Sequence, residues 1–277
     1  MKAAFNILPE INENEPLHLL IEVGSYGIAC SWFTKNPVDI KGLAVYNFIS
    51  PDSNSDTASE IINVLSSNVI FTGSNASVTI CYDFKESLLV PAEYHNMETG
   101  KGMLELVYNA DHGTTIQTDA IAAIDIFNTY AVDKRITESF NNKFPGAVFY
   151  HSTSLQLQRI NSSVEKMHCI VFHNTLKVFL FSEDGLQFIQ QFNYSKPVDA
   201  AYHLINCCEQ HDIKSSGINL KLSGMIDEHS NLYIELYKYF LNISFELPDE
   251  HITMHERIKF YPSHFFSHLT ALVSCVS

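Results

Sequence analysis

Basic residues are scarce in this sequence, which has 17 Lys and Arg against 31 Asp and Glu in 277 residues and a formal net charge of −14 with His neutral. No run of Lys or Arg forms a local basic patch. A surface this acidic repels phosphate groups, so nucleic acid and anionic membranes are poor partners. We therefore expect this chain to bind no nucleic acid.

Long apolar runs are also missing. No segment reaches the roughly 18 consecutive apolar residues that a bilayer-spanning helix needs, and the first residues, Met1–Phe5, lead into Pro9 without the apolar core of a signal peptide. The 6 cysteines contain no C-x-x-C pair, which favours reduced thiols that act as small apolar side chains. These observations predict a cytoplasmic protein with no membrane insertion.

Several catalytic motifs are absent. The sequence has no G-x-S-x-G elbow and no glycine-rich dinucleotide or Walker turn. His251 and His255 are four residues apart, as are His264 and His268, so each pair could share a helix face and bind a metal. Pro262 separates the pairs and no H-E-x-x-H order occurs, so surface or hydrogen-bonded histidines are favoured over a metal site.

The composition itself is that of a globular protein. Apolar residues make up 46% of the chain, aromatic residues 12% and charged residues only 17%, which is too apolar for a disordered chain. The length predicts one large domain or two modest ones.

An ordered series of apolar segments opens the chain. We expect strands where buried runs follow one another across tight turns, and a helix where apolar residues follow the i, i+3, i+4 spacing. Thr57 and Glu60 predict a capping box at the start of that helix. The series is strand Leu17–Val23, strand Ile28–Phe33, strand Ile40–Phe48, helix Asp56–Ser66 and strand Ser77–Tyr82.

The same order of elements recurs about 150 residues later, which indicates an internal duplication of architecture. The second series is strand Met167–Phe172, strand Leu176–Phe181, strand Leu186–Tyr194, helix Pro197–His211, strand Ile218–Leu222 and a helix from Ser230 to about Phe240. Between the series, Asp119–Tyr130 and Lys134–Phe144 predict two helices, and Ala147–His151 a strand. We place the boundary at the polar Asn161-Ser162-Ser163, which gives domains 1–155 and 156–277.

This duplicated order resembles the ribonuclease-H-like units of the actin-like ATPase fold. Sugar kinases, the 70-kDa heat-shock chaperones and cytoplasmic scaffold proteins of bacterial pili and secretion systems share that plan. More narrowly, the chain resembles the bacterial domain-of-unknown-function family 3822. The residues that carry the resemblance are Leu17–Val23, Ser87–Tyr94, Phe144-Pro145, Phe192–Tyr194 with Asp199–Tyr202, and Leu222-Ser223-Gly224. The resemblance implies an α/β protein made of two ribonuclease-H-like halves.

The resemblance also implies a phosphate-binding turn with a carboxylate and a glycine in each half. The first half has Glu22 two residues before Gly24, with the Ser25 hydroxyl next, although a buried strand that ends in an ordinary hairpin explains the same residues. The second half has neither a carboxylate nor a glycine in its turn, His173-Asn174-Thr175. Asp111-His112-Gly113-Thr114-Thr115 looks like the missing motif but precedes the predicted linker helices, so we interpret it as a loop.

Two functional hypotheses follow from these residues. In the first, the chain is a scaffold without catalytic residues, cofactor or metal, and it binds a protein partner; Tyr233, Tyr237 and Tyr239 suit such an interface as well as a covering helix. In the alternative, it is a nucleotide- or sugar-phosphate-binding enzyme that takes Mg-ATP between its halves. The residues involved would then be Glu22, Gly24, Ser25 and Gly224.

Overall fold

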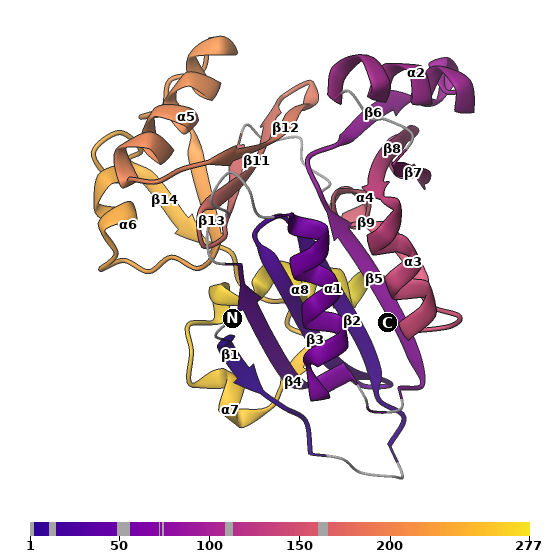
Figure 1. Cartoon of the computed structure of the whole chain (residues 1–277). Coiled ribbons are helices and arrows are strands. Elements are labelled where there is room, and N and C mark those ends of the chain that lie inside the picture. Colours follow the sequence, from indigo (N-terminus) through magenta and orange to yellow (C-terminus); the bar gives the residue numbers. More distant parts are fainter. Residues whose placement is uncertain are drawn as a thin grey trace. The chain divides into compact units, whose positions relative to one another are not determined.

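The computed structural model describes residues 3–10, 15–48, 56–71, 73, 75–108, 113–159 and 166–277 (Figure 1). The chain divides into two compact units. Unit 1 comprises residues 1–160, 251–258 and 272–277, and unit 2 comprises residues 161–250 and 259–271. The predicted boundary at Asn161-Ser162-Ser163 lies outside the described residues. Each unit has its own sheet and its own apolar core.

The main sheet of unit 1 contains the predicted meander. Its strands are β1 (Ala3–Ile7), β2 (His18–Gly24), β3 (Gly27–Lys35), β4 (Val38–Asn47), β5 (Ser77–Asp83), β9 (Val148–His151) and β15 (Thr253–Met254). The order is β1-β4-β3-β2-β5-β9, with β15 beside β4. β2, β3 and β4 are antiparallel neighbours, whereas β5 and β9 run parallel to β2. Between His18 and Gly24, β2 is apolar apart from Glu22, and residues 19–24 are all buried, as expected of a central strand covered on both faces.

Two helices lie side by side in unit 1: α1 (Thr57–Ser67) and α3 (Lys134–Lys143). Ile61 and Leu65 of α1 and Ile136 and Phe140 of α3 are buried in the same core as the β2 side chains. The capping box predicted from Thr57 and Glu60 is wrong, because the cap is Asp56, whose carboxylate accepts from the Ala58 N–H.

A three-stranded sheet replaces one predicted helix. Residues 119–130 form most of a hairpin between β7 (Thr114–Ile121) and β8 (Ile126–Asp133), to which β6 (Ser87–Pro91) adds in the order β6-β8-β7. The alanine-rich turn at 122–125 suggested a helix, but Asp125 has a left-handed φ of 54° that reverses the chain. Helix α2 (Met97–Tyr108) packs on β6 and β8.

Unit 2 repeats the strand order of unit 1. Its sheet is β12-β11-β10-β13-β14, with β10 to β12 antiparallel and β13 and β14 parallel to β10. The strands are β10 (Lys166–Val171), β11 (Thr175–Ser182), β12 (Gly185–Asn193), β13 (Asn219–Gly224) and β14 (Asn242–Phe245). The prediction of two architecturally equivalent α/β halves is therefore confirmed.

Helices α5 (Pro197–Gln210) and α6 (Asn231–Leu236) contact each other and share the core of unit 2. Ser230 caps α6 as predicted, since its hydroxyl accepts from the Tyr233 N–H, but the helix ends at Leu236 rather than near Phe240. The remaining helical elements are η1 (Val69–Phe71), η2 (Ala92–Tyr94), α4 (Ser152–Arg159), α7 (Glu256–Lys259), η3 (Ser263–Phe265) and α8 (Ser267–Val276). Among the described residues, no helix is long and apolar enough to cross a membrane.

Candidate functional site

The carboxyl ends of the parallel strands β2, β5 and β9 meet at one edge of the sheet of unit 1. In α/β sheets this edge is where ligands bind, because the loops and helix N-termini gather there. Three polar side chains stand at it: Glu22 near the end of β2, Asp83 at the end of β5 and His151 at the end of β9. All three are almost completely buried.

The resemblance assigns phosphate binding to Glu22, Gly24 and Ser25, which lie at the end of β2 and in the β2–β3 turn. Glu22 is fully buried and lies between Ala29 of β3 and Cys81 of β5 in the strand register. Ser25 is exposed at the tip of the turn. Gly24 is buried as well, and its surroundings decide what the turn can hold.

The side chain of Tyr26 folds back over Gly24. A Cβ added to Gly24 would lie 2.6 Å from Cε1 of Tyr26 and 2.7 Å from the carbonyl oxygen of Asp83. The tyrosine is only 5% exposed, and its hydroxyl donates to Oδ2 of Asp83 at 3.0 Å. The space that glycine leaves open is thus filled by the chain's own ring and backbone.

The electrostatic surroundings keep Tyr26 protonated. Burial raises the pKa of its phenol well above the ordinary value, and the neighbouring carboxylates of Asp83 and Glu22 raise that pKa further. A neutral phenol is a hydrogen-bond donor, so Tyr26 acts here as a donor to the acidic groups of the edge.

Asp83 and His151 tie this edge to the start of α4. The hydroxyl of Ser152 donates to Oδ1 of Asp83. The Thr153 N–H donates to Nδ1 of His151 at 3.2 Å, and Nε2 of the same ring faces the Phe84 carbonyl oxygen at 3.0 Å. Only the neutral tautomer with its proton on Nε2 satisfies both contacts. His151 therefore links the end of β9 to Phe84 and to the start of α4.

Asp119 of β7 is the third carboxylate of this region. It accepts from the His151 N–H at 2.7 Å and from the Tyr130 hydroxyl at 3.3 Å. Burial raises the pKa of Asp119, although these hydrogen bonds oppose the shift. Sequence reasoning missed Asp119 because it assigned the residue to a helix, and it missed Asp83 because the predicted strand ended at Tyr82. A carboxylate directly after a buried strand was the available signal for Asp83.

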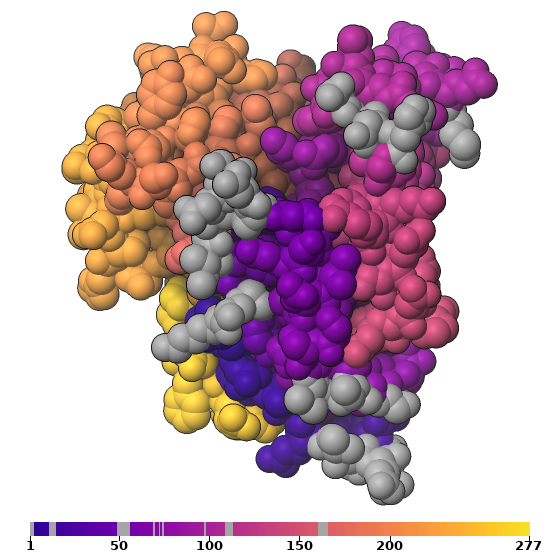
Figure 2. Space-filling model, in the orientation of Figure 1, coloured from indigo at the N-terminus to yellow at the C-terminus, as the bar shows by residue number. Residues whose placement is uncertain are grey.

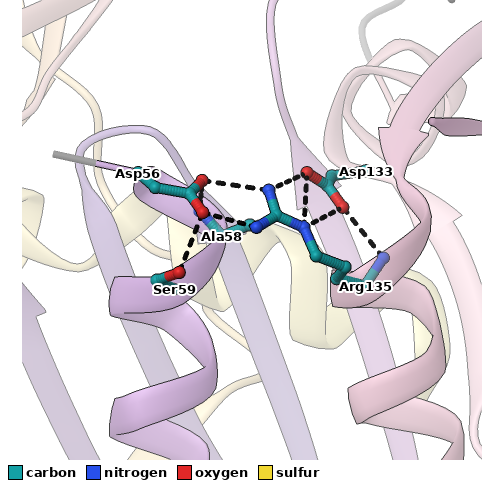
Figure 3. Close-up of polar contacts among 5 residues, drawn as sticks. All are labelled: Asp56, Ala58, Ser59, Asp133 and Arg135. Atoms are coloured by element: carbon teal, nitrogen blue, oxygen red, sulfur yellow. Dashed lines mark hydrogen bonds and ion pairs between the residues drawn. The ribbon is translucent and has the colours of Figure 1, made fainter. Parts of the chain in front are cut away.

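Arg135 joins the N-termini of α1 and α3 (Figure 3). Its guanidinium contacts both oxygens of Asp56, the cap of α1, at 2.5 and 3.0 Å. It also contacts Asp133, the cap of α3, through Nη2 at 2.6 Å and through Nε at 3.1 and 3.3 Å. These hydrogen bonds raise the pKa of Arg135, and the contacts of Arg135 and Ser59 lower the pKa of Asp56. Both helix N-termini are therefore already engaged by carboxylates of the chain.

In unit 2, the corresponding turn between β10 and β11 has neither a carboxylate nor a glycine and closes with a Phe172 N–H to Thr175 carbonyl bond of 2.9 Å. Gly224 ends β13 with a φ of +85°. A Cβ at Gly224 would lie 2.2 Å from the carbonyl oxygen of Val171, whose oxygen accepts from the Met225 N–H at 2.7 Å. The parallel pairing of β10 and β13 therefore requires a glycine here without any ligand.

The remaining motifs do not add a site. Asp111 and His112 lie outside the described residues, whereas Thr114 and Thr115 begin β7. His264 is buried, with Nε2 at 2.6 Å from the Ile226 carbonyl oxygen and its ring stacked on Phe245. In the part of the chain that the structure describes, no three His, Cys, Asp or Glu side chains are grouped to hold a metal.

The duplicated sheet order defines the class of protein: an α/β protein with the actin-like ATPase fold, as two solved structures also show. A Bacteroides thetaiotaomicron protein with this fold and unknown function superposes with a TM-score of 0.73 at 16% identity, over 96% of this chain and 99% of its own. A chain of the PilM–PilN type IV pilus biogenesis complex superposes with a TM-score of 0.60 at 12% identity, over 94% and 98% respectively.

The sequence then specifies the family. The model of the family described as "Protein of unknown function (DUF3822)" matches residues 9–243, and the chain belongs to that family. A comparison with curated proteins found no match. The family resemblance drawn from the sequence is therefore confirmed.

Proposed function

We propose that this chain is a non-catalytic protein of the actin-like fold that serves as a scaffold for another protein. The observation that carries the proposal is the position of Tyr26, whose ring fills the space over Gly24 and whose hydroxyl is bound to Asp83. Phosphoryl transfer depends on close backbone approach and on a metal that neutralises the phosphates. Because the ring of Tyr26 already occupies the space over Gly24, a phosphate group could not approach the backbone of this turn closely.

Unit 2 supports the same proposal. Its turn at 173–175 offers no carboxylate for a hydrated metal, and Gly224 faces the backbone of Val171. We accordingly propose that the chain uses no cofactor. The neighbour in the PilM–PilN complex was solved with a protein partner, which supports a binding role for this fold. A cytoplasmic location remains part of the proposal. The cysteines, which are mostly buried and form no disulfide among the described residues, are compatible with it.

The competing hypothesis is a nucleotide- or sugar-phosphate-binding enzyme in which Glu22 holds a metal and Gly24, Ser25 and Gly224 contact the ligand. The favourable observation is the burial of Glu22 and Asp83 at the carboxyl edge of one sheet. Two carboxylates at such an edge are the usual start of a magnesium site.

Thermal unfolding with and without Mg-ATP separates the two hypotheses. We expect the melting temperature to stay the same, whereas a ligand at one hundred times its Kd would stabilise the fold by about 2.7 kcal/mol. Glu22→Gln provides the control, because it keeps the size of the side chain and removes its charge. A stabilisation by Mg-ATP that Glu22→Gln abolishes would overturn the scaffold proposal.

A further inference from the structure

Helix α2 leaves an apolar stripe uncovered on the surface of unit 1. Leu106 is 86% exposed, Val107 58% and Met103 43%. These three residues are spaced i, i+3, i+4, so they form one continuous stripe along the helix. In the space-filling view the segment lies at the surface (Figure 2). The inward side of α2 is separate, since Leu104 and Tyr108 pack with Ala131 of β8.

Two glycines in α2 have different surroundings. A Cβ at Gly100 would lie 3.2 Å from the side chain of Thr129, so close packing on β8 explains that glycine. A Cβ at Gly102 would meet nothing within 4 Å. Glycine inside a helix lowers its stability relative to alanine, and nothing in the described part of the chain requires one at position 102.

Gly102 stands at the border between the apolar stripe and an acidic row. It is one helical turn from Glu98 on one side and from Leu106 on the other, and Glu105 lies three residues ahead. Glu98 and Glu105 are exposed, and Lys101 is the one cation of α2, 3.7 Å from Glu105. A bare backbone between the two rows lets another helix approach closely.

We infer that the outer face of α2, formed by Gly102, Met103, Leu106 and Val107, docks an amphipathic helix of a partner protein. The partner helix has an apolar stripe of its own, bordered by Lys or Arg that face Glu98 and Glu105. A second copy of this chain fits poorly because it would bring a second acidic row and a net charge of −14. Anionic lipid is disfavoured for the same reason. The inference rests on the proposed scaffold function and specifies its binding surface.

Photo-crosslinking in the native cells tests the inference. A benzophenone side chain replaces Leu106 in the full chain, and the attached peptide is sequenced by mass spectrometry. We expect a peptide of another protein with apolar residues at helical spacing and flanking Lys or Arg. A crosslink to the chain itself, to lipid or to an acidic peptide would overturn the inference, as would the absence of any crosslink.

The two glycines supply a matched pair of variants. We expect Gly102→Ala to keep or raise the melting temperature and to reduce the Leu106 crosslink at least tenfold, because the added methyl group blocks the partner and not the fold. Gly100→Ala, whose methyl group would face Thr129 on the inward side of the helix, should leave the Leu106 crosslink unchanged. If Gly102→Ala leaves the crosslink unchanged, close approach at α2 is refuted.

A second crosslinking position keeps this inference distinct from the scaffold proposal. Tyr237 on unit 2 is 57% exposed and lies outside α2. A protein captured at Tyr237 with none at Leu106 would overturn docking at α2 and leave the scaffold proposal standing. Binding of Mg-ATP that depends on Glu22 would instead overturn the scaffold proposal, with or without a crosslink at Leu106.

Discussion

A tyrosine hydroxyl carries a single proton, and at the β2–β3 turn Tyr26 donates that proton to Asp83. The ring covers Gly24 at the same time. One side chain thus donates to a buried carboxylate and fills the space next to Gly24. The space next to Gly24 is therefore set by the ring of Tyr26, although Glu22 and Gly24 are the residues that stand out in the sequence.

Tyr26→Phe removes the hydroxyl and keeps the ring. We expect a loss of about 1–3 kcal/mol in the free energy of unfolding, because the buried carboxylate of Asp83 loses the hydrogen bond from Tyr26. Urea unfolding at pH 7 measures the change. Tyr237→Phe is the control: because Tyr237 is 57% exposed, loss of its hydroxyl should change the free energy of unfolding by no more than about 0.5 kcal/mol. Equal effects of the two substitutions would contradict the role assigned to Tyr26.

At the scale of secondary-structure elements, Arg135 joins the N-termini of helices α1 and α3 in unit 1. Asp56 and Asp133 each cap a helix, and Arg135 contacts both carboxylates (Figure 3). A cap is a local feature, but the bridge joins residues 79 positions apart. The sequence predicted the helices α1 and α3 correctly and placed the cap of α1 on the wrong residue, because Thr57 and Glu60 match a capping box as well as Asp56 matches a simple cap.

Asp56→Ala tests the cap and its charge together. We expect a loss of about 1 kcal/mol in the free energy of unfolding. Because the pKa of Asp56 is lowered in the folded chain, its stabilising effect is complete above the unfolded pKa of about 4 and is lost as the pH falls through the folded value. Urea unfolding between pH 8 and pH 3 measures the difference from the wild type.

The expected difference is constant above about pH 5 and shrinks below about pH 4. Glu138→Ala is the control, because the exposed pair of Glu138 with Lys134 at 3.8 Å should contribute little. A loss that stays unchanged down to pH 3 would show that the charge of Asp56 has no part in the cap.

The hairpin of β7 and β8 shows where element prediction failed and why. Residues 122–125 contain two alanines and an isoleucine, a composition that favours a helix, whereas their turn depends on the left-handed Asp125. The partner strand β6 lies about forty positions earlier, as the Leu88–Thr129 pairing illustrates. Asp119 itself meets His151 across 32 positions. A contact at that distance leaves no local periodic signal, so Asp119 could not be placed at the site from the sequence.

At the scale of the whole molecule, the chain builds the same sheet order twice, β4-β3-β2-β5-β9 in unit 1 and β12-β11-β10-β13-β14 in unit 2. Each sheet has its own core of buried apolar side chains. The acidic excess is a property of the whole chain, and it acts on any charged partner through long-range repulsion or attraction.

The net charge leads to a prediction about nucleic acids. We expect double-stranded DNA and single-stranded RNA to bind more weakly than micromolar at about 150 mM salt, because their phosphates meet an acidic surface. Fluorescence anisotropy with labelled oligonucleotides provides the measurement. A micromolar or tighter Kd for either nucleic acid would show that a basic surface has been overlooked.

The sequence by itself determined the charge, the two meanders, the helices that follow them and the family, since each of these depends on composition or on neighbours along the chain. Tertiary structure alone decided that Tyr26 reaches Asp83 across 57 positions and that Arg135 reaches Asp56 across 79. It also decided that Gly224 faces Val171. These contacts form only when strands and helices pack, because side chains distant in sequence then share one edge of a sheet.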